Sequence, residues 1–178
     1  MNKIHIHEYN GYAATVEIDE ANGAGETLTH NITNANMGSV DATNLDPVSY
    51  PIIAGERSYV KYQKFHVTAM GGSSKVSNLK VWRTGALGAN ASHITNARTT
   101  SYAGAITYAE PVDIAVTDVD QTMPTSEPAS ANLGIGGSLA GELTTTGSSD
   151  YLAHQLTTTA SAVAGATMTQ NYQYDEIA

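Results

Sequence analysis

The segment YVKYQKFHVTAMGGSSKVSNLKVW, Tyr59–Trp82, has the clearest pattern in the chain. From Lys64 to Ala69, polar and apolar residues alternate, which is the period of two that indicates a strand with one buried face. After Gly-Gly-Ser-Ser, Leu79 and Val81 alternate with polar residues in the same way. We therefore predict two strands joined as a hairpin, with the large indole of Trp82 covered by another segment or chain.

Short strands separated by turn residues are predicted on both sides of this hairpin. The predicted strands are residues 3–9, 12–18, 26–32, 105–110, 112–119, 150–158 and 166–177. Asn10-Gly11 predicts a tight turn between the first two. Residues 33–57 are rich in Asn, Gly, Asp and Pro and predict a long loop. No segment has a helical period, so we predict an all-β protein, an Ig-like or jelly-roll β-sandwich with long loops. Residues 1–54 form its N-terminal hairpin and extended arm, and residues 55–178 the sandwich.

The composition predicts a thin hydrophobic core. Leu, Ile, Val and Phe account for 32 of the 178 residues, and Ala, Thr, Gly, Ser and Asn dominate the rest. Burial of apolar surface contributes roughly 25 cal/mol per Å², so a core this small suggests that neighbouring chains supply part of the stability. There is no cysteine, no secretory signal at the start and no apolar run of membrane-spanning length. We expect a protein folded in a reducing cytoplasm and not inserted in a membrane.

Charge is distributed unevenly along the chain. The net charge is -9, six of the eight Lys and Arg residues lie between Arg57 and Arg83, and none follows Arg98. Nucleic-acid binding is disfavoured because phosphates require a net basic surface. Three interpretations of the basic segment remain open: lysines that block strand-edge pairing, a small phosphate-contacting patch, or docking against an acidic surface of a neighbour.

One pair of histidines has the spacing of metal ligands. His5 and His7 lie two residues apart, so on a strand both rings point to the same side. The sequence shows no third ligand nearby, and we predict exposed strand histidines, or histidines stacked at a symmetry axis in an oligomer, with no metal or other cofactor.

Other possible chemical motifs are incomplete. Asp118 and Asp120 lack the further oxygen ligands and the glycine of a calcium loop. The GIGG run at 134–137 lacks the spacing of a dinucleotide site and predicts a turning loop. Asp150 and His154 have no associated nucleophile motif. We therefore predict no catalytic residue and no enzyme, with a small hydrolase as the disfavoured alternative.

Three segments together resemble β-sandwich structural proteins of tailed-phage virions: ERSYVKYQKFHVTAMGGSSKVSNLKVWRTG (56–85), MPTSEPASANLGIGGSLAGELTTTGSSDYLAHQL (123–156) and AGATMTQNYQYDEI (164–177). The similarity rests on F-x-V-T-A followed by V-S-N-L-x-V-W, and on the closing Q-Y-D-E. It covers residues 55–178. It implies a sandwich packed into a virus particle, in a head decoration, tail or neck position.

From this resemblance we expect a bacteriophage capsid decoration (cement) protein. It would stabilise the head through contacts with the major capsid protein or other virion proteins, as a homotrimer, in a virion assembled in the host cytoplasm. The predicted interface residues are Ile4, Ile6, Lys61, Lys64, Lys80, Trp82 and Arg83. The alternatives are a tail or neck component, or a carbohydrate-binding sandwich that stacks sugars on Trp82, Tyr102 and Tyr108.

Overall fold

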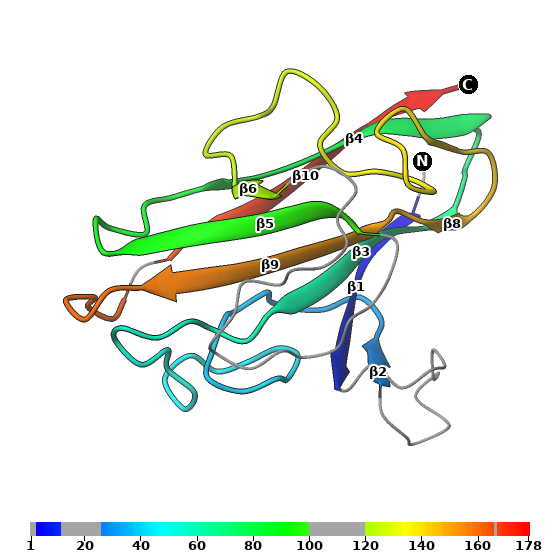
Figure 1. The fold of residues 1–178 in the computed structure, drawn as a ribbon. Coiled ribbons are helices and arrows are strands. Elements are labelled where there is room, and N and C mark those ends of the chain that lie inside the picture. Colours follow the sequence, from blue (N-terminus) through cyan, green and yellow to red (C-terminus); the bar gives the residue numbers. More distant parts are fainter. Residues whose placement is uncertain (1–2, 12–25, 100–119, 166) are drawn as a thin grey trace.

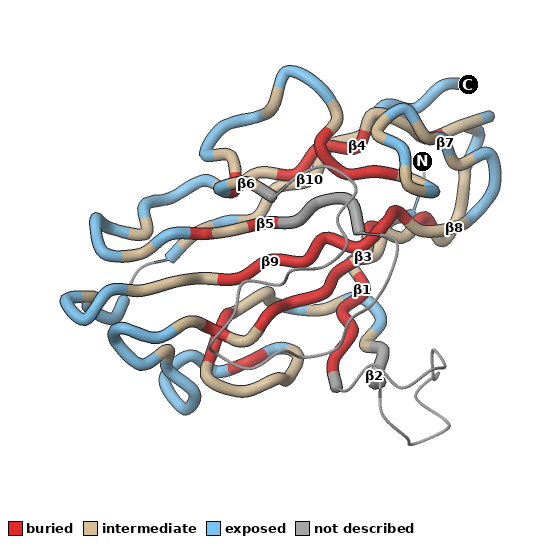
Figure 2. Tube along the Cα trace, viewed as in Figure 1, coloured by how far each residue is buried: buried red, intermediate tan, exposed pale blue. Residues whose placement is uncertain are grey.

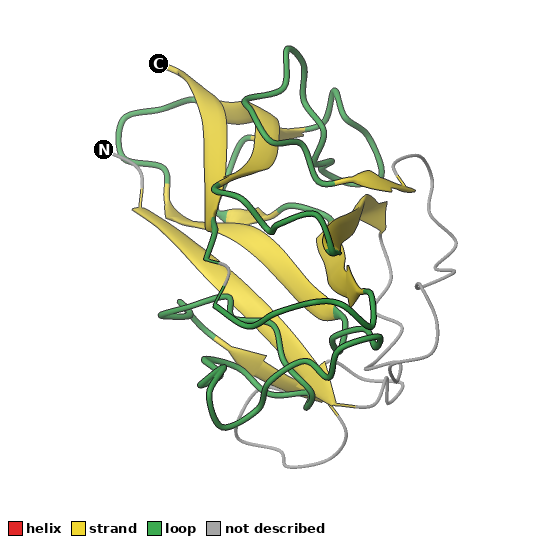
Figure 3. Cartoon of the chain, turned by 90° about the vertical axis from the view of Figure 1, so that its left-hand side faces the viewer, coloured by secondary structure: helices red, strands yellow, loops and turns green. Residues whose placement is uncertain are grey.

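The computed structural model describes residues 3–11, 26–99, 120–165 and 167–178. These residues form ten strands and no helix, in two antiparallel sheets (Figures 1 and 3), which confirms the predicted all-β class and is consistent with a β-sandwich. In the described part of the chain, no helix has the length and apolar character of a membrane span.

The larger sheet has seven strands. Its spatial order is β2 (Glu26–Thr29), β1 (Lys3–Gly11), β3 (Lys61–Ala69), β9 (Tyr151–Thr158), β5 (Ala91–Thr99) and β6 (Asp120–Thr122), with the short β8 (Gly147–Ser148) also pairing with β3. The smaller sheet is β10 (Thr169–Ile177), β4 (Lys75–Thr84) and β7 (Glu142–Leu143), in that order.

The predicted hairpin is wrong in its pairing, although both of its strands exist. β3 pairs with β1, β8 and β9, whereas β4 pairs with β10 and β7. The turn between them, where Gly71 has φ 59° and the Ser73 amide donates to Met70 O, therefore carries the chain from one sheet to the other. The physical reason is that both strands have an apolar face. A two-stranded ribbon would leave those faces in water, while two stacked sheets bury them against each other.

The core lies between the two sheets. Its buried residues are Phe65, Val67, Val76, Leu79, Val81, Met123, Leu133 and Leu152, and Figure 2 shows burial concentrated along β3, β9 and β4. Val76 and Leu79 both point inward although they are three residues apart. Asn78 between them has φ 53°, and the pairing with β10 shifts register nearby, so a local irregularity turns Leu79 back to the core.

A loop residue supplies hydrogen bonds to the backbone along one edge of β4. Asn132 is buried, its Oδ1 accepts from the Val81 amide and its Nδ2 donates to Val81 O, both at 2.8 Å. The amides of Asn132 and Leu133 also donate to Leu79 O. The side chain thus takes the place of a neighbouring strand for one residue, and it satisfies backbone groups that would otherwise be buried without partners.

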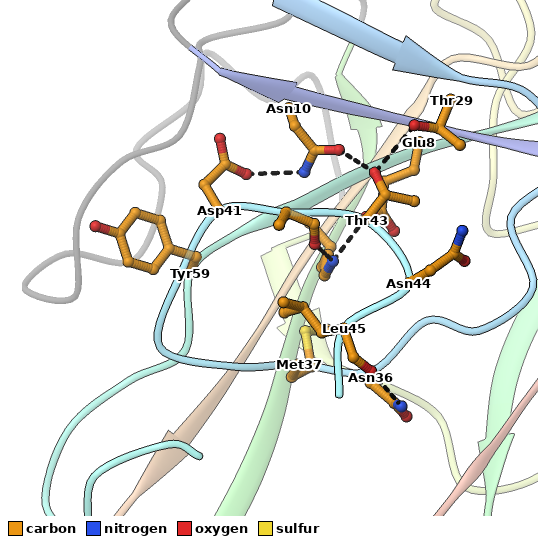
Figure 4. Close-up of polar contacts among 12 residues, drawn as sticks. Glu8, Asn10, Thr29, Asn36, Met37, Asp41, Thr43, Asn44, Leu45 and Tyr59 are labelled. Atoms are coloured by element: carbon orange, nitrogen blue, oxygen red, sulfur yellow. Dashed lines mark hydrogen bonds and ion pairs between the residues drawn. The ribbon is translucent and has the colours of Figure 1, made fainter. Parts of the chain in front are cut away.

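The N-terminal segment belongs to the sheet. β1 lies between β2 and β3, and Ile4 and Ile6 pack against the core. The predicted turn at Asn10-Gly11 is wrong, because both residues continue β1 and pair with β2. Asn10 is held there by its side chain, which donates to Asp41 and accepts from the Thr43 hydroxyl (Figure 4). This tertiary contact outweighs the local turn preference.

Of the other strands, some were predicted and one long strand, β5, was not. The strands predicted at 26–32, 150–158 and 166–177 are confirmed as β2, β9 and β10, and residues 33–57 are confirmed as a long segment without a strand. β5 was not predicted, since its sequence ASHITNART has few large apolar residues. The predicted strands at 12–18, 105–110 and 112–119 lie outside the described residues.

Candidate functional site

The lysines of the basic segment have partners within the same chain. Lys61 Nζ lies 2.6 Å from Glu8 Oε1, and Lys80 Nζ lies 2.9 Å from Glu127 Oε1. Lys75 pairs with Glu142. Glu127 and Glu142 come from the acidic C-terminal half of the chain. The basic segment is therefore complementary to other parts of its own chain and does not present these three ammonium groups as one basic surface.

The predicted interface residues lie in three different places. Ile4, Ile6 and Lys61 face the interior, and Lys61 is only 1% exposed, so a partner cannot reach its ammonium in this conformation. Lys64 lies on the outer face of the larger sheet, with Nζ 3.9 Å from the centre of the Tyr151 ring. Lys80, Trp82 and Arg83 lie together on β4, where Trp82 is half-buried opposite Asn171 of β10.

The interior beside the apolar core is polar. Glu8 accepts one hydrogen bond from Lys61 and a second from Gln63 Nε2 at 2.8 Å. The other side of the Gln63 amide, Oε1, accepts from the Tyr172 hydroxyl at 3.1 Å. His154 Nε2 lies 3.1 Å from the same oxygen. This network joins the two sheets where few apolar side chains are available.

A pair of histidines extends this interior network. His154 Nδ1 lies 2.8 Å from His93 Nε2, and both rings are fully buried. Burial lowers the pKa of His93 to about 4 and that of His154 well below its usual range. Both rings are therefore neutral at pH 7 and act as hydrogen-bonding groups that need no counter-charge.

A pocket of about 500 Å³ opens on the outer face of the larger sheet, opposite the core. The alternation of β1 puts His5, His7 and Tyr9 on this face, and that of β3 adds Lys64, His66 and Thr68. His30, which follows β2, and Ser148 of β8 complete the lining. The sequence showed the His5–His7 pair. It could not show that pairing of β1 with β2 and β3 would bring two further histidines beside it.

Three of the four histidines of this pocket contact one another closely. The His7 and His66 rings stack with centroids 4.3 Å apart, and His30 Nδ1 lies 3.3 Å from His7 Nε2. His66 Nδ1 lies 2.6 Å from the Ser148 hydroxyl. Burial is the main cause that lowers the pKa of His7 to about 4, and the neighbouring His66, His30, His5 and Lys64 lower it further. Burial also lowers the pKa of His66.

The pocket does not carry a complete catalytic or metal constellation. The Ser148–His66 pair has the two groups of a nucleophile and base, but none of the described lining residues is a carboxylate that could orient the imidazole. Among the described residues, no three His, Asp or Glu side chains are arranged to hold a metal ion. What the pocket offers is a concentration of nitrogen and hydroxyl donors.

The other sequence motifs have structural roles where they are described. GIGG at 134–137 forms a tight turn, as predicted, with Gly136 and Gly137 at positive φ. The Gly137 amide donates to both carboxylate oxygens of Asp150, so this carboxylate holds the turn. Asp120 is in β6, whereas Asp118, Tyr102 and Tyr108 lie outside the described residues.

Three strongly exposed apolar side chains lie on two loops. Val48 and Ile53, in the 33–57 segment, are 86% and 59% exposed, and Val163 in the loop after β9 is 86% exposed. The 33–57 segment contacts the end of β9, where Thr158 Oγ1 donates to Ile53 O at 3.2 Å and accepts from the Gly55 amide at 3.1 Å. Gly55 also lies beside Ala160, so the loop after β9 adjoins this segment. Figure 1 shows them side by side at the end of β9.

No protein-family model, no curated protein and no solved structure matches the chain.

Proposed function

We propose that this chain is a structural virion protein of a bacteriophage, a capsid decoration protein that binds the shell through the loops at the end of β9. The resemblance of residues 55–178 to virion sandwiches suggests the setting. The observation that carries the proposal is the exposure of Val48, Ile53 and Val163 on two adjoining loops. Apolar side chains this exposed contribute little to folding, and two adjoining loops that carry them are typical of a protein-contact surface.

These loops are held in place by the rest of the molecule. The Ser39 amide donates to Tyr50 O at 3.2 Å and the Tyr59 amide to Gly38 O at 3.0 Å, which ties the 33–57 segment to itself and to the start of β3. Asp46 accepts from the Val48 amide and the Ser49 hydroxyl, and these hydrogen bonds lower its pKa. A loop that is already ordered loses less conformational entropy when it binds a partner.

Charge has a smaller role in this proposal than the sequence suggested. Lys61, Lys75 and Lys80 are paired with carboxylates of the same chain. Their contribution to an intermolecular contact is correspondingly reduced, because a new partner would have to displace an existing one. Binding to the shell is then driven by apolar contact, and it should persist at moderate salt concentration.

The test is co-sedimentation of the purified protein with undecorated shells. The variant Val48→Ser/Ile53→Ser/Val163→Ser should lose binding at least tenfold, with its thermal unfolding unchanged. Ile177→Ser is the matched control, because Ile177 is 44% exposed at the end of β10, at the other end of the molecule in Figure 1. Wild-type protein that does not bind shells, or equal losses in both variants, would contradict the proposal.

The same preparation tests position and oligomeric state. Sedimentation velocity measures whether free protein is the expected homotrimer. Quantitative mass spectrometry of purified particles gives its copy number relative to the major shell protein. Hundreds of copies per particle support a head decoration, whereas a copy number of about twelve or fewer would reassign the chain to the tail or neck.

A further inference from the structure

We propose that the pocket lined by His5, His7, His30, Lys64 and His66 is a binding site for an oxyanion, a carboxylate or a tetrahedral anion such as sulfate or phosphate. This site lies on the outer face of the larger sheet and is separate from the loops at the end of β9. The inference goes beyond the proposed structural role and does not depend on it.

The pocket is rich in hydrogen-bond donors. Four imidazoles, the ammonium of Lys64 and the hydroxyls of Tyr9, Thr68 and Ser148 line one pocket of about 500 Å³. All are hydrogen-bond donors by type, and those of the histidines and Lys64 carry the proposal, because the Thr68 hydroxyl donates to Lys3 O and the Ser148 hydroxyl is bonded to His66. The carboxylate nearest in sequence, Glu8, points to the opposite face and is occupied by Lys61 and Gln63. Among the described residues that line the pocket, none is a carboxylate that would repel an anion.

The pocket differs in charge from the rest of the chain. The protein carries a net charge of -9, yet this pocket collects one lysine and four of the six histidines. They come from separate parts of the chain: β1, the end of β2, and β3, brought together by the registers His5↔His66 and His7↔Lys64. A local site of positive or protonatable groups in an acidic protein attracts anions to one place.

The arrangement of the histidine nitrogens fits an anion better than a metal ion. The closest nitrogens, His7 Nε2 and His30 Nδ1, are 3.3 Å apart, but no third side chain in the described residues completes a coordination sphere around them. His66 is already engaged through Nδ1 with the Ser148 hydroxyl. An oxyanion has less demanding geometry than a transition metal and can accept bonds from several directions at once.

Binding should be coupled to protonation. Among the described residues, the groups that face the pocket are His5, His7 and Tyr9 from β1, His30 after β2, Lys64 and His66 from β3, with Tyr151 of β9 beneath the lysine. Burial first, and then the neighbouring rings and Lys64, lower the pKa of His7 and disfavour its charged form. A bound anion reverses this balance, so that at least one histidine takes up a proton and affinity rises as the pH falls.

The experiment follows the histidine ring signals by NMR during titration with sodium sulfate, which keeps its charge of minus two from pH 5.5 to pH 7.5. Ionic strength is held constant with sodium chloride. The pocket signals should shift saturably, and the dissociation constant should be at least fivefold lower at pH 5.5 than at pH 7.5. Absence of saturable shifts at both pH values would overturn the proposal.

Two variants and one control locate the site. Lys64→Met and His30→Gln should each weaken sulfate binding at least fivefold, and His30 is exposed, so its replacement leaves folding intact. Lys75→Met removes the same charge outside the pocket and should bind as wild type. Equal weakening in all three variants would show non-specific charge attraction and overturn the proposal. Saturable zinc binding without sulfate binding would overturn it in favour of a metal.

A parallel titration distinguishes the source of the anion. Sodium acetate that competes with sulfate indicates a site that also accepts carboxylates, such as an acidic side chain of a partner. Sulfate binding that acetate does not displace indicates a site for a free tetrahedral anion. Either result supports an oxyanion pocket.

Discussion

Lys61 and Glu8 form a salt bridge with Nζ 2.6 Å from Oε1 and with side chains that are 1% and 0% exposed. The ammonium also donates to Ala42 O at 2.5 Å, which ties the 36–45 segment to β1 and β3. Figure 4 shows this segment beside β1, with Asp41 and Thr43 next to Asn10. One ion pair thus connects the long N-terminal loop to the centre of the larger sheet.

Removing one member of this pair should be strongly destabilising. Lys61→Met leaves Glu8 buried without its counter-charge, and we expect a loss of about 3 to 5 kcal/mol in the free energy of unfolding, measured by urea denaturation. The double variant Lys61→Met/Glu8→Leu should recover a large part of that loss, because it buries no lone charge. Lys75→Met, at a more exposed pair, should cost about 1 kcal/mol or less. A Lys61→Met variant as stable as Lys75→Met would contradict this account.

Stability should decrease below pH 6.5. His93 has a pKa lowered to about 4 by burial, and its ring would titrate near 6.5 in the unfolded chain. Between these values the unfolded state binds more protons, so the free energy of unfolding falls as the pH falls, by about 3 kcal/mol for His93 alone at pH 4. His154, shifted in the same direction, adds to the effect.

Urea denaturation at pH 7.5, 6.5, 5.5 and 4.5 measures this dependence. His93→Gln should reduce the slope below pH 6.5 by about one proton, whereas replacement of the exposed His30 by Gln should leave most of it. A wild-type protein whose stability is constant from pH 7.5 to pH 4.5 would refute neutral burial of these rings.

Gly38 fixes the 33–57 loop and cannot be replaced without moving it. A Cβ atom there would lie 2.6 Å from Tyr50 O and 2.9 Å from the Leu45 side chain. We expect Gly38→Ala to cost about 1 to 3 kcal/mol and to weaken shell binding by displacing the exposed apolar residues. Gly72→Ala, with nothing within 4 Å of the added atom, is the control. Equal stability of the two variants, measured by thermal denaturation, would show that the loop adapts freely.

Removing the side-chain amide of Asn132 should lower the free energy of unfolding by more than the loss of an exposed side chain of the same size. Asn132→Ala removes the partners of both the N–H and C=O of Val81 in a buried position, and we expect a loss of about 2 to 4 kcal/mol. Asn171→Ala, which removes an exposed contact to Thr84, should cost less than about 0.5 kcal/mol. Hydrogen exchange of the Val81 amide should be faster than in the wild type in Asn132→Ala and unchanged in Asn171→Ala.

The sequence by itself determined the all-β class and most of the individual strands. The alternation from Lys64 to Ala69 correctly assigned which side of β3 is buried, because side-chain direction in a strand depends only on local geometry. The strands Tyr151–Thr158 and Thr169–Ile177 were also predicted, the second of them from its alternating residues. β5 carried no such signal: its buried positions include His93 and Thr95, whose burial depends on partners far away in sequence.

Only the tertiary structure decided how these strands pair and which side chains meet. β3 and β4 looked like a hairpin, but each buries its apolar face by stacking on the other from a separate sheet, a choice set by the total burial of the molecule and not by the turn between them. Pairing of β1 with β2 and β3 brought His30 and His66 to the His5–His7 pair. It also placed Lys61 against Glu8, 53 residues away. Such long-range neighbours depend on register and sheet order, which local patterns do not contain.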